Sequence, residues 1–557
     1  MQIFNQFSLS NVKGDLFGGV TAAVIALPMA LAFGVASGAG AEAGLYGAVL
    51  VGLFAALFGG TPTLISEPTG PMTVVFTAVI TTMMATNPEN GMAMAFTTVM
   101  LAGLFQIIFG LLKLGRYVTM MPYTVISGFM SGIGFILIII QMPALLGYAS
   151  PGGGVLGSLT ALPELAAHFK PGETELGLLA LAILFLMPKR LRRFVPPQLL
   201  ALVVGTLLAV LVLGSGDYRA IGEIPGGLPS MQMPTFSAVQ LQTILVDALV
   251  LAMLGAIDAL LTSVIADSLT RTHHNSDKEL VGQGLGNLAS GLFGGLPGAG
   301  ATMGTVVNIQ TGARSALSGV TRALVLAVVV FGASGLVEVI PKAVLAGIAI
   351  KVGIDIIDWA FLRRAHKVSM RGALIMYGVI AMTVFIDLIT AVGIGLFVAN
   401  VLTIRRLADL QSEEVRLIGL PGSPDEPECE NALPEEKKII GDPSNGVAML
   451  CLSGPLIFGA AKAVTRQQYA LTGARSLVVD LTDVPHLGVT AALAVESIIR
   501  EAAQQGCRVY LAGLNPQTTK RFESLDINDV VPAENWIAKR VDALKRAVSD
   551  RVGSKKV

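Results

Sequence analysis

Two stretches rich in glycine and proline decide the fold of this chain: EPTGPMTVVFTAVI at residues 67–80 and GAGATMGTVV at residues 298–307. Each places helix-starting signals inside an otherwise apolar segment, so we expect a short helix to begin in the middle of each one. The two stretches lie 231 residues apart, and Asp15 and Asp247 repeat at nearly the same offset. This spacing indicates an internal repeat with one interrupted segment in each half.

The composition around these stretches is that of a membrane protein with a soluble tail. Hydrophobic residues make up 53% of the 557 residues and charged residues only 14%, whereas a soluble protein carries about 25% charged residues. Residues 406–557 hold 20 of the 38 acidic and 18 of the 38 basic residues. The net charge is zero, which gives no bulk basic field to attract nucleic acid.

Apolar segments of the length needed to cross a bilayer, roughly 20 residues, follow one another up to residue 405. We expect fourteen spans, at residues 17–37, 44–59, 70–86, 92–112, 123–146, 174–190, 197–214, 240–267, 280–294, 302–312, 317–340, 343–361, 370–387 and 389–404. Seven is an odd number, so the second half must run upside down relative to the first. Inverted repeats are typical of secondary transporters, whose substrate site lies at paired broken helices.

The basic residues orient the chain, because cytoplasmic loops carry the excess of Lys and Arg. With the N-terminus inside, the outer loops carry only Lys170, Arg219 and Lys342. The inner loops carry Lys113, Arg116, Lys189, Arg190, Arg192, Arg193, Arg271, Lys278, Arg314, Arg363, Arg364, Lys367 and Arg371. An even number of spans then puts the tail inside. All three cysteines lie in the tail, and their odd number suits a reducing compartment better than a disulfide framework.

Half-helices that begin at mid-membrane offer an anion site without any basic side chain. Their first backbone N–H groups have no partner within the helix, and the helix dipole adds partial positive charge. Two such ends that face each other can hold an anion. Thr69 and Thr302 stand at N-cap-like positions, where a hydroxyl either caps the helix or reaches the ligand.

Asp258 is the conspicuous charge within the apolar spans, because it lies well inside LVLAMLGAIDALLTSVIAD at residues 249–267. A carboxylate there is costly and by default functional; the alternative is a protonated or Thr-bonded structural acid. Thr262 lies four residues on, on the same helical face. Oxygens of Asp258, Thr262 and the backbone near Gly300 are hard ligands, suited to Na⁺ or to a proton relay rather than to a transition metal.

Other polar residues in the apolar part are weaker candidates. Glu67 stands beside the first break, where it lines either the pathway or a cytoplasmic vestibule. Polar residues within spans are more often hydrogen-bond partners between helices than ligands, which applies to Gln106, Gln141 and Asn308. His273 and His274 lie in a predicted cytoplasmic loop among charged residues, and we interpret them as part of a solvated loop and not as a metal site. No catalytic cluster of the kind found in enzymes is evident.

The tail changes pattern from about Val447. Short apolar runs at 446–454, 476–481 and 507–514 predict strands, and the segments after Pro455 and Val489 predict helices. We expect a small α/β layer. The acidic, proline-containing residues 406–436 predict a linker before it.

Three stretches resemble the sulfate permease (SulP) family, which includes the solute carrier 26 anion exchangers. They are GDLFGGVTAAVIALPMALAFGVASG at 14–38, GPMTVVFTAVI at 70–80 and GQGLGNLASGLFGGLPGAGATMGTVVNIQTGARSALSG at 282–319. The resemblance covers nearly the whole chain. It implies fourteen spans in a seven-plus-seven inverted repeat, with a core domain (spans 1–4 and 8–11) that moves like an elevator against a gate domain (spans 5–7 and 12–14), and a dimer.

One departure from the family pattern carries information. The family commonly has an Arg just inside the second half-helix, whereas this chain has Gly304, and the eighth-span acid is Asp258 instead of the usual Glu. A mobile cation could replace the missing Arg charge. Within the family the chain looks most like the cyanobacterial sodium-dependent bicarbonate transporters. That likeness implies Na⁺ coordination by Asp258, Thr262, Gly300 and Thr302, and bicarbonate contact by Thr69, Ala301 and Thr302.

The tail resembles the STAS domain that ends most members of this family. STAS domains commonly carry an Asp-Ser/Thr-Ser/Thr-Gly turn, and the matching stretch here is LGVTA at 487–491. Thr490 keeps a hydroxyl where related regulators are phosphorylated, but the Asp is lost. The resemblance therefore implies a domain for dimer contact and stability first, and for regulation second.

The sequence thus predicts an all-α membrane part (1–405), a linker (406–436) and a cytoplasmic STAS domain (437–557). We expect a non-enzymatic, sodium-coupled bicarbonate symporter of the plasma membrane, with Na⁺ as coupling ion, no cofactor and no nucleic-acid partner. The alternative is a proton- or sodium-coupled sulfate/dicarboxylate permease of the same fold. A membrane sensor that does not transport ranks last, because it needs no repeated pair of half-helices.

Overall fold

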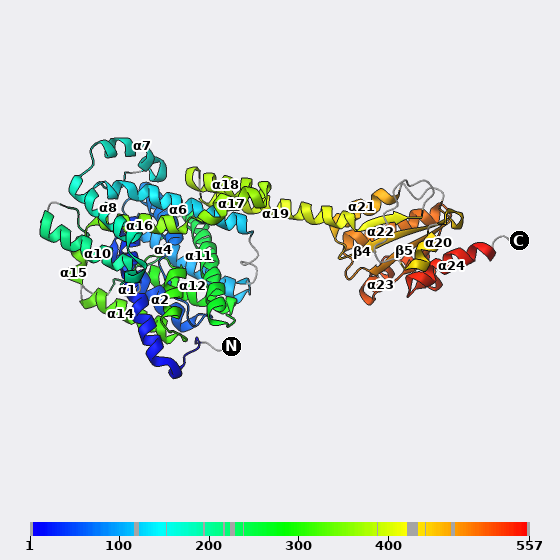
Figure 1. The fold of residues 1–557 in the computed structure, drawn as a ribbon, viewed down its shortest axis with the longest axis horizontal. Helices are drawn as coiled ribbons and strands as arrows, with labels where there is room; N and C mark the ends of the chain where they lie inside the picture. Colours follow the sequence, from blue (N-terminus) through cyan, green and yellow to red (C-terminus); the bar gives the residue numbers. More distant parts are fainter. Residues whose placement is uncertain are drawn as a thin grey trace. The chain divides into compact units, whose positions relative to one another are not determined.

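The computed structural model describes residues 4–115, 122–151, 153–192, 195–214, 218–222, 229–237, 239–332, 334–386, 388–419, 433–440, 442–468 and 474–553. The chain forms two compact units, residues 1–399 and 400–557. The first is a bundle of helices and the second a sheet covered by helices (Figure 1).

Each predicted span falls on a helix of the first unit. In chain order these helices are α1 (Val12–Ser37), α2 (Ala41–Phe58), α3 (Gly70–Thr86), α4 (Gly91–Leu111), α6 (Tyr123–Leu145), α8 (Pro171–Leu186), α10 (Pro197–Leu208), α11 (Leu241–Thr270), α12 (Ser276–Leu292), α13 (Thr302–Gln310), α14 (Leu317–Gly332), α16 (Lys342–Ile356), α18 (Met370–Phe385) and α19 (Leu388–Glu413). Five of the described helices, α1, α2, α4, α6 and α11, are each long and apolar enough to cross a bilayer alone. The number of crossings and the inverted repeat stay predictions.

Two helices of ten residues or more, α7 and α17, were not predicted. α7 (Gly154–Ala167) follows α6, and α17 (Trp359–Val368) lies between α16 and α18. The predicted span 343–361 runs past the end of α16 into α17, whose start is set by Asp358, which accepts a hydrogen bond from the Phe361 amide. Both helices are shorter than a membrane span, and α17 is rich in basic residues, so neither forms an apolar run of spanning length.

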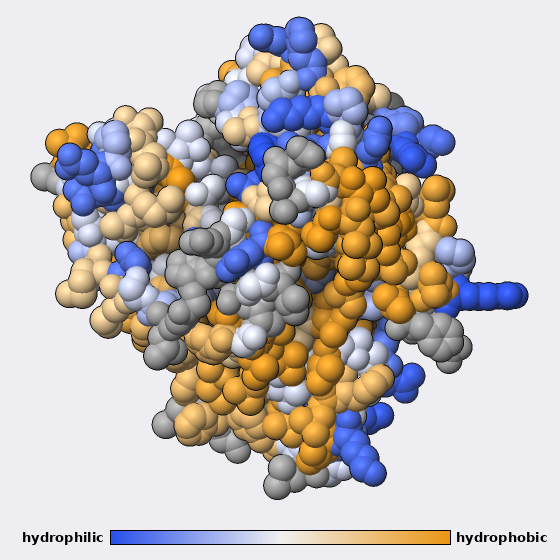
Figure 2. Space-filling model, turned by 90° about the vertical axis from the view of Figure 1, so that its left-hand side faces the viewer, coloured by the Kyte–Doolittle hydropathy of each residue, from blue (hydrophilic) through white to orange (hydrophobic). Residues whose placement is uncertain are grey.

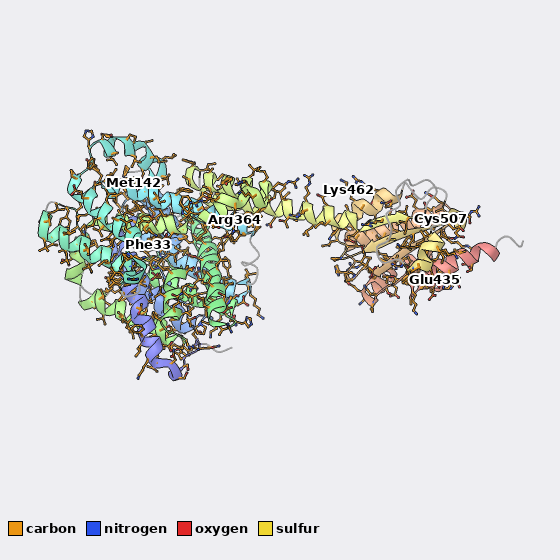
Figure 3. The ribbon with its side chains drawn as sticks, viewed as in Figure 1. Phe33, Met142, Arg364, Glu435, Lys462 and Cys507 are labelled. Carbon is orange, nitrogen blue, oxygen red and sulfur yellow. The ribbon has the colours of Figure 1, made fainter. Side chains whose placement is uncertain are left out.

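The interior of the bundle is packed with small residues that let helices touch. A side chain at Gly44 of α2 would collide with the Ala30 carbonyl of α1, so glycine is required where these two helices meet. Phe33 of α1 is fully buried within the bundle (Figure 3). Close approach of this kind is how helices associate in lipid, where burial of apolar surface gives no driving force.

Much of the outside of the first unit is apolar. Figure 2 shows broad hydrophobic surfaces on one face of the molecule. Large apolar side chains stand out from several helices, among them Leu211 (78% exposed), Val328 (70%) and Phe397 (70%). A soluble protein does not expose so much contiguous apolar surface. The unit therefore lies in a membrane.

The second unit is a five-stranded sheet in the order β3-β4-β5-β6-β7. Strand β3 (Val415–Ile418) pairs antiparallel with β4 (Val447–Ser453). β4, β5 (Ser476–Asp483), β6 (Arg508–Ala512) and β7 (Trp536–Ile537) are parallel. The other helices are α20 (Pro434–Ile440), α21 (Phe458–Gln468), α22 (Val489–Gln504), α23 (Pro516–Glu523) and α24 (Arg540–Gly553). The predicted strands and helices are confirmed, and exposed Thr490 lies in the first turn of α22.

The predicted linker at 406–436 is wrong at both ends. α19 continues to Glu413, and β3 joins the sheet because its backbone completes the free edge of β4. α20 is held to the domain by Arg540, which bonds both Glu436 (2.9 Å) and Asp480 (3.1 Å). Residues 420–432 of the linker lie outside the described part of the chain.

The cysteines depart from the expectation of free thiols. Cys507 is free, and burial raises its pKa. Cys451 is disulfide-bonded, and Cys429 lies outside the described residues.

Candidate functional site

The two breaks in the apolar sequence meet as a short antiparallel ladder. Strands β1 (Ser66–Glu67) and β2 (Ala299–Gly300) pair with Ser66 opposite Gly300 and Glu67 opposite Ala299. The ladder is extended by the Ala301 amide, which donates to the Ile65 carbonyl at 2.8 Å. Segments more than 230 residues apart are thus joined through their backbones, a pairing that the sequence did not predict.

Each strand leads directly into one of the short helices. Thr69 is the N-cap residue of α3 and Ala301 that of α13, so Thr302 is the first helical residue and not the cap that its sequence position indicated. Neither helix start is capped by a side chain. Because the strands are antiparallel, α3 and α13 leave the ladder in opposite directions, with their N-terminal ends toward it.

These ends leave backbone N–H groups available for a ligand. The first bonds along the helices run from the Thr73 amide to the Thr69 carbonyl and from the Thr305 amide to the Ala301 carbonyl, both at 2.9 Å. The amides before Thr73 and Thr305 therefore have no acceptor within their own helix. Thr302 and Met303 are exposed, so a ligand can reach the start of α13.

Three of the four predicted Na⁺ ligands are in direct contact. The Thr262 hydroxyl donates to the Gly300 carbonyl at 2.9 Å and lies 3.0 Å from the Thr302 hydroxyl. Thr262 itself is fully buried in α11. A side chain at Gly300 would stand 3.0 Å from the Ala259 Cα and 3.2 Å from the Thr262 Cβ, which is why the ladder needs glycine to approach α11. Their role as ligands stays a prediction.

Asp258 lies one turn before Thr262 on the same face of α11. Its carboxylate interacts with Thr69 across the site. Neither Asp258 Oδ2 nor the Thr69 hydroxyl, however, makes a well-formed hydrogen bond with any described residue. Asp258 also lines an otherwise apolar cavity of about 240 Å³ between α6, α11 and α19. Among the described residues, no Lys or Arg forms an ion pair with Asp258.

Sequence reasoning missed Arg322. Arg322 of α14 is 1% exposed and forms an ion pair with Glu67 of β1, which is 3% exposed. The same guanidinium donates to the carbonyls of Ala48 and Ser66, both at 3.0 Å. An Arg inside an apolar span is the same signal that singled out Asp258, so it was available in the predicted span 317–340.

The Glu67 side chain also reaches the start of α13. A Cβ atom at Gly304 would lie 3.6 Å from Glu67 Oε1 and 3.1 Å from Ile65 Cγ2. The position at which the family resemblance implies a fixed cation is therefore occupied here by a glycine that faces a carboxylate. The only arginine described at this carboxylate is Arg322.

Buried amides hold the ladder in place. Asn287 of α12 clamps Gly298 by donating to its carbonyl (2.9 Å) and accepting from its amide (2.8 Å). It also donates to Gln106 (2.8 Å). Asn308 donates to the Thr63 carbonyl at 2.9 Å. Gln106 and Asn308 are thus hydrogen-bond partners between elements, as predicted, whereas the structural role of Asn287 was missed.

The remaining candidates lie apart from this cluster. His274 contacts Asp267 at 2.7 Å and Ser276 at 2.9 Å. No group of three or more His, Cys, Asp or Glu suited to a metal occurs in the described part of the chain. For Gln141, which is buried in α6, the structure gives no contact that would assign a role.

Comparisons with known proteins place this geometry in context. The sulfate permease family model matches residues 12–379, and the STAS domain model matches residues 442–544. The chain is 62% identical to the bicarbonate transporter BicA of Synechocystis sp., over 98% of this chain and 96% of that protein. It is 60% identical to BicA of Picosynechococcus sp., over 98% and 97%.

Solved structures agree with the fold. The transmembrane domain of a cyanobacterial bicarbonate transporter BicA is 68% identical, with a TM-score of 0.67 over 70% of this chain and all of that one. The overall structure of SLC26A9 matches 99% of this chain and 92% of that one, with a TM-score of 0.82 at 15% identity.

Proposed function

The chain belongs to the sulfate permease family, whose members are transporters and not enzymes, and from this premise we propose that it imports bicarbonate together with Na⁺. The substrate rests on 60–62% identity to proteins named as bicarbonate transporters, over nearly their full length. The coupling ion rests on one observation. Thr262, Thr302 and the Gly300 carbonyl converge where the two half-helices start, one turn from the carboxylate of Asp258.

The charge of the available groups decides which residues bind Na⁺ and which bind bicarbonate in this proposal. Na⁺ takes the oxygens of Asp258, Thr262, Gly300 and Thr302, all hard ligands. Bicarbonate lies between the starts of α3 and α13, beside Thr69, Ala301 and Thr302, and accepts from the free amides of the first helical turns. The Ala301 amide is engaged with Ile65, so Ala301 serves through its backbone position and not as a donor.

The two ions need each other at this site. Glu67 neutralises Arg322, so the nearby ion pair adds little net charge, and Asp258 alone would repel an anion. A cation a few ångströms from Asp258 removes that repulsion, which is worth on the order of 4 kcal/mol at 4 Å and an effective dielectric of 20. Bound Na⁺ thereby makes the site attractive to bicarbonate, which is the physical basis of coupling.

The proposal extends to topology and movement. We place the N-terminus and the STAS domain in the cytoplasm, on the distribution of Lys and Arg. The core comprises α1–α4 and α11–α14, and it moves like an elevator against a gate made from α6, α8, α10, α16, α18 and α19. The ladder lies wholly within the core, so it would carry both ions as a unit. We further propose a dimer in which the STAS domains make contact.

Transport into proteoliposomes tests this function. The purified protein is reconstituted, and uptake of labelled bicarbonate and labelled sulfate is measured with and without an inward Na⁺ gradient. Protein-free vesicles correct for CO₂ leakage. We expect Na⁺-stimulated uptake of bicarbonate and little uptake of sulfate. Sulfate uptake that exceeds bicarbonate uptake would establish the alternative permease, and equal bicarbonate uptake with and without Na⁺ would remove the coupling.

A further inference from the structure

Glu279 is a buried acid that the proposed transport function does not use. It lies in the first turn of α12 and is 1% exposed. In the orientation proposed above, this end of α12 faces the cytoplasm. Among the described residues, no Lys or Arg forms an ion pair with Glu279. Burial of a carboxylate without such a partner is costly, so the contacts of this side chain require an explanation.

Both carboxylate oxygens of Glu279 accept hydrogen bonds, and the two bonds lead in different directions. Oε2 accepts from the amide of Gly60, in the segment between α2 and β1, at 2.9 Å. Oε1 accepts from the side-chain amide of Gln283 at 2.8 Å. The carboxylate also interacts with Thr61. Glu279 therefore joins α12 to the segment that leads into the ladder.

Gln283 connects this acid to the ladder itself. It lies one turn farther along α12 and is fully buried. The amide nitrogen that donates to Glu279 also donates to Ser66 Oγ of β1 at 2.6 Å. Ser66 pairs with Gly300 in the ladder. A single side chain thus links the carboxylate of Glu279 to a residue of the half-helix site.

The two ends of the Gln283 amide are bonded unequally. Its nitrogen donates two hydrogen bonds, whereas its buried oxygen accepts none from any described residue. An unsatisfied buried acceptor in a native protein calls for an explanation. Rotation of the amide by half a turn would exchange nitrogen and oxygen. That exchange becomes favourable as soon as the neighbouring groups turn from acceptors into donors.

Protonation of Glu279 would produce this change. The Gly60 amide is a donor at every pH, so the oxygen facing it must stay an acceptor and the proton goes to the oxygen facing Gln283. The rotated Gln283 amide then accepts from Glu279 and from the Ser66 hydroxyl, which becomes a donor. Because burial favours the protonated form of a carboxyl group, acidification of the cytoplasm would drive this rearrangement.

We propose that Glu279 is a positioning residue for the half-helix site, whose ionised form holds Ser66, and hence the ladder, in the arrangement that binds bicarbonate. This inference rests on the proposed function and deepens it. Protonation of Glu279 reverses the direction of the hydrogen bond at Ser66 and weakens bicarbonate binding. The affinity of the site thereby follows the pH of the cytoplasm.

Other charged groups near Glu279 come from α12, from α11 and from the turn between them. His274, in that turn, acts on Glu279 electrostatically and contacts Asp267 of α11 at 2.7 Å. Lys278 and Asp277 are neighbours on α12. α4 and the segment between α2 and β1 carry no charged residue. Histidine is the side chain that ordinarily titrates near neutral pH, so the test must separate His274 from Glu279.

The test compares Glu279→Gln with the original full chain in proteoliposomes. The bicarbonate concentration for half-maximal uptake is measured at saturating Na⁺, at about pH 8 and at about pH 6. An amide at 279 has one oxygen, which Gly60 requires, so its nitrogen faces Gln283 as the added proton would. We expect the variant to need about fivefold more bicarbonate at the higher pH, the worth of one hydrogen bond. At the lower pH the two proteins should agree within about twofold.

The ratio of the two proteins at each pH cancels effects that they share, such as titration of Asp258 and conversion of bicarbonate to CO₂. A merely structural role of Glu279 would lower the maximal rate and leave the half-saturating concentration unchanged. Asp277→Asn is the matched control, because it removes an acid from the same turn but keeps the oxygen that accepts from the Gly115 amide at 3.0 Å. It should stay within about twofold of the original protein at both pH values.

The same ratio measured in a His274→Gln background separates the histidine, and we expect it to change with pH as before. A ratio that is equal at both pH values, or that loses its pH dependence in the His274→Gln background, overturns the inference and leaves the proposed function standing. If Glu279→Gln fails to insert, Gln283→Met replaces it under the same criteria, because it removes the amide that links Glu279 to Ser66. An original protein that takes up no bicarbonate at either pH refutes the proposed function and this inference with it.

Discussion

In the proposed function, Asp258 is the residue on which sodium coupling would depend most directly. It shares a helix face with Thr262, which contacts both Gly300 and Thr302, so an ion held there would touch three separate elements. The carboxylate is the only one of these ligands with a full charge. The other three proposed ligands have only neutral oxygens, which would orient the ion without offsetting its charge.

We therefore expect Asp258→Asn to abolish Na⁺-driven bicarbonate uptake. The amide keeps the shape of the side chain but removes the charge that offsets Na⁺ in a low-dielectric site. Uptake at graded Na⁺ concentrations measures this, with gel filtration in detergent as a check on insertion and folding. An Asn variant whose uptake still rises with Na⁺ as in the original protein would contradict the assignment.

Gly304 tests whether Na⁺ substitutes for a fixed positive charge. An Arg at 304 would begin 3.6 Å from Glu67 Oε1 and would bring a guanidinium to the start of α13. Like charges about 4 Å apart repel by on the order of 4 kcal/mol at an effective dielectric of 20, enough to empty a weak Na⁺ site. We expect Gly304→Arg to take up bicarbonate with a reduced Na⁺ requirement.

The control for this variant is Gly304→Met, which adds bulk without charge against Ile65. Activity lost in both variants indicates a blocked pocket, and activity lost only in the Arg variant indicates that the charge is harmful. A Gly304→Arg protein that transports with the original Na⁺ requirement would show that position 304 lies away from the ion.

The decisive element is the β1–β2 ladder, because it fixes the starts of both half-helices at once. Its four residues are held from three sides. Asn287 clamps the approach to β2, Thr262 bonds Gly300, and Arg322 bonds Ser66 and Glu67. Small displacements of any of these would move the N-terminal ends of α3 and α13 relative to each other.

The ion pair of this element predicts an asymmetric mutational effect. Arg322→Met should destabilise the protein by about 3–5 kcal/mol, because it leaves Glu67 as a buried, unpaired charge. The double variant Glu67→Gln with Arg322→Met should recover much of that loss, since neither charge remains. Thermal unfolding in detergent, followed by the loss of the gel-filtration peak, measures both. Equal losses in the single and double variants would show that the pair itself matters little.

At the scale of the whole molecule, the chain comprises two units with separate cores. The sheet of the second unit has apolar clusters on both faces, with α21 and α22 on one side and α24 on the other. Every proposed ion ligand belongs to the first unit. α19 continues beyond the apolar region to Glu413.

A chain that ends at Arg406 should therefore still insert and bind bicarbonate in the presence of Na⁺. It retains both half-helices and the ladder, although the last turns of α19 are lost. Isothermal calorimetry on the purified protein measures binding, and light scattering measures the mass of the assembly, which we expect to fall if STAS contacts hold the dimer. A truncated protein that elutes as a single sharp peak yet binds no bicarbonate would mean that the tail contributes to the site.

The sequence by itself determined the helices of the membrane part, the strands of the tail and the two breaks. Apolar runs, glycine and proline report local backbone preferences, and those preferences decided where α3 and α13 begin. Helix-start signals and a carboxylate within an apolar span singled out residues 69, 258, 262, 300 and 302, and the likeness to the family added Ala301 and the assignment of each residue to Na⁺ or bicarbonate. The spacing of 231 residues indicated which segments correspond, and the ladder brings these segments together.

Only the tertiary structure decided which residues meet across the chain. The pairing of Glu67 with Arg322, the clamp of Asn287 on Gly298 and the addition of β3 to the tail sheet all join distant segments. α7 and α17 were not predicted, because neither contains an apolar run long enough to cross a bilayer. These contacts have one physical reason in common. Local sequence sets the backbone conformation, whereas a buried charge or an unpaired strand edge needs a partner, and the tertiary packing decides which residue becomes that partner.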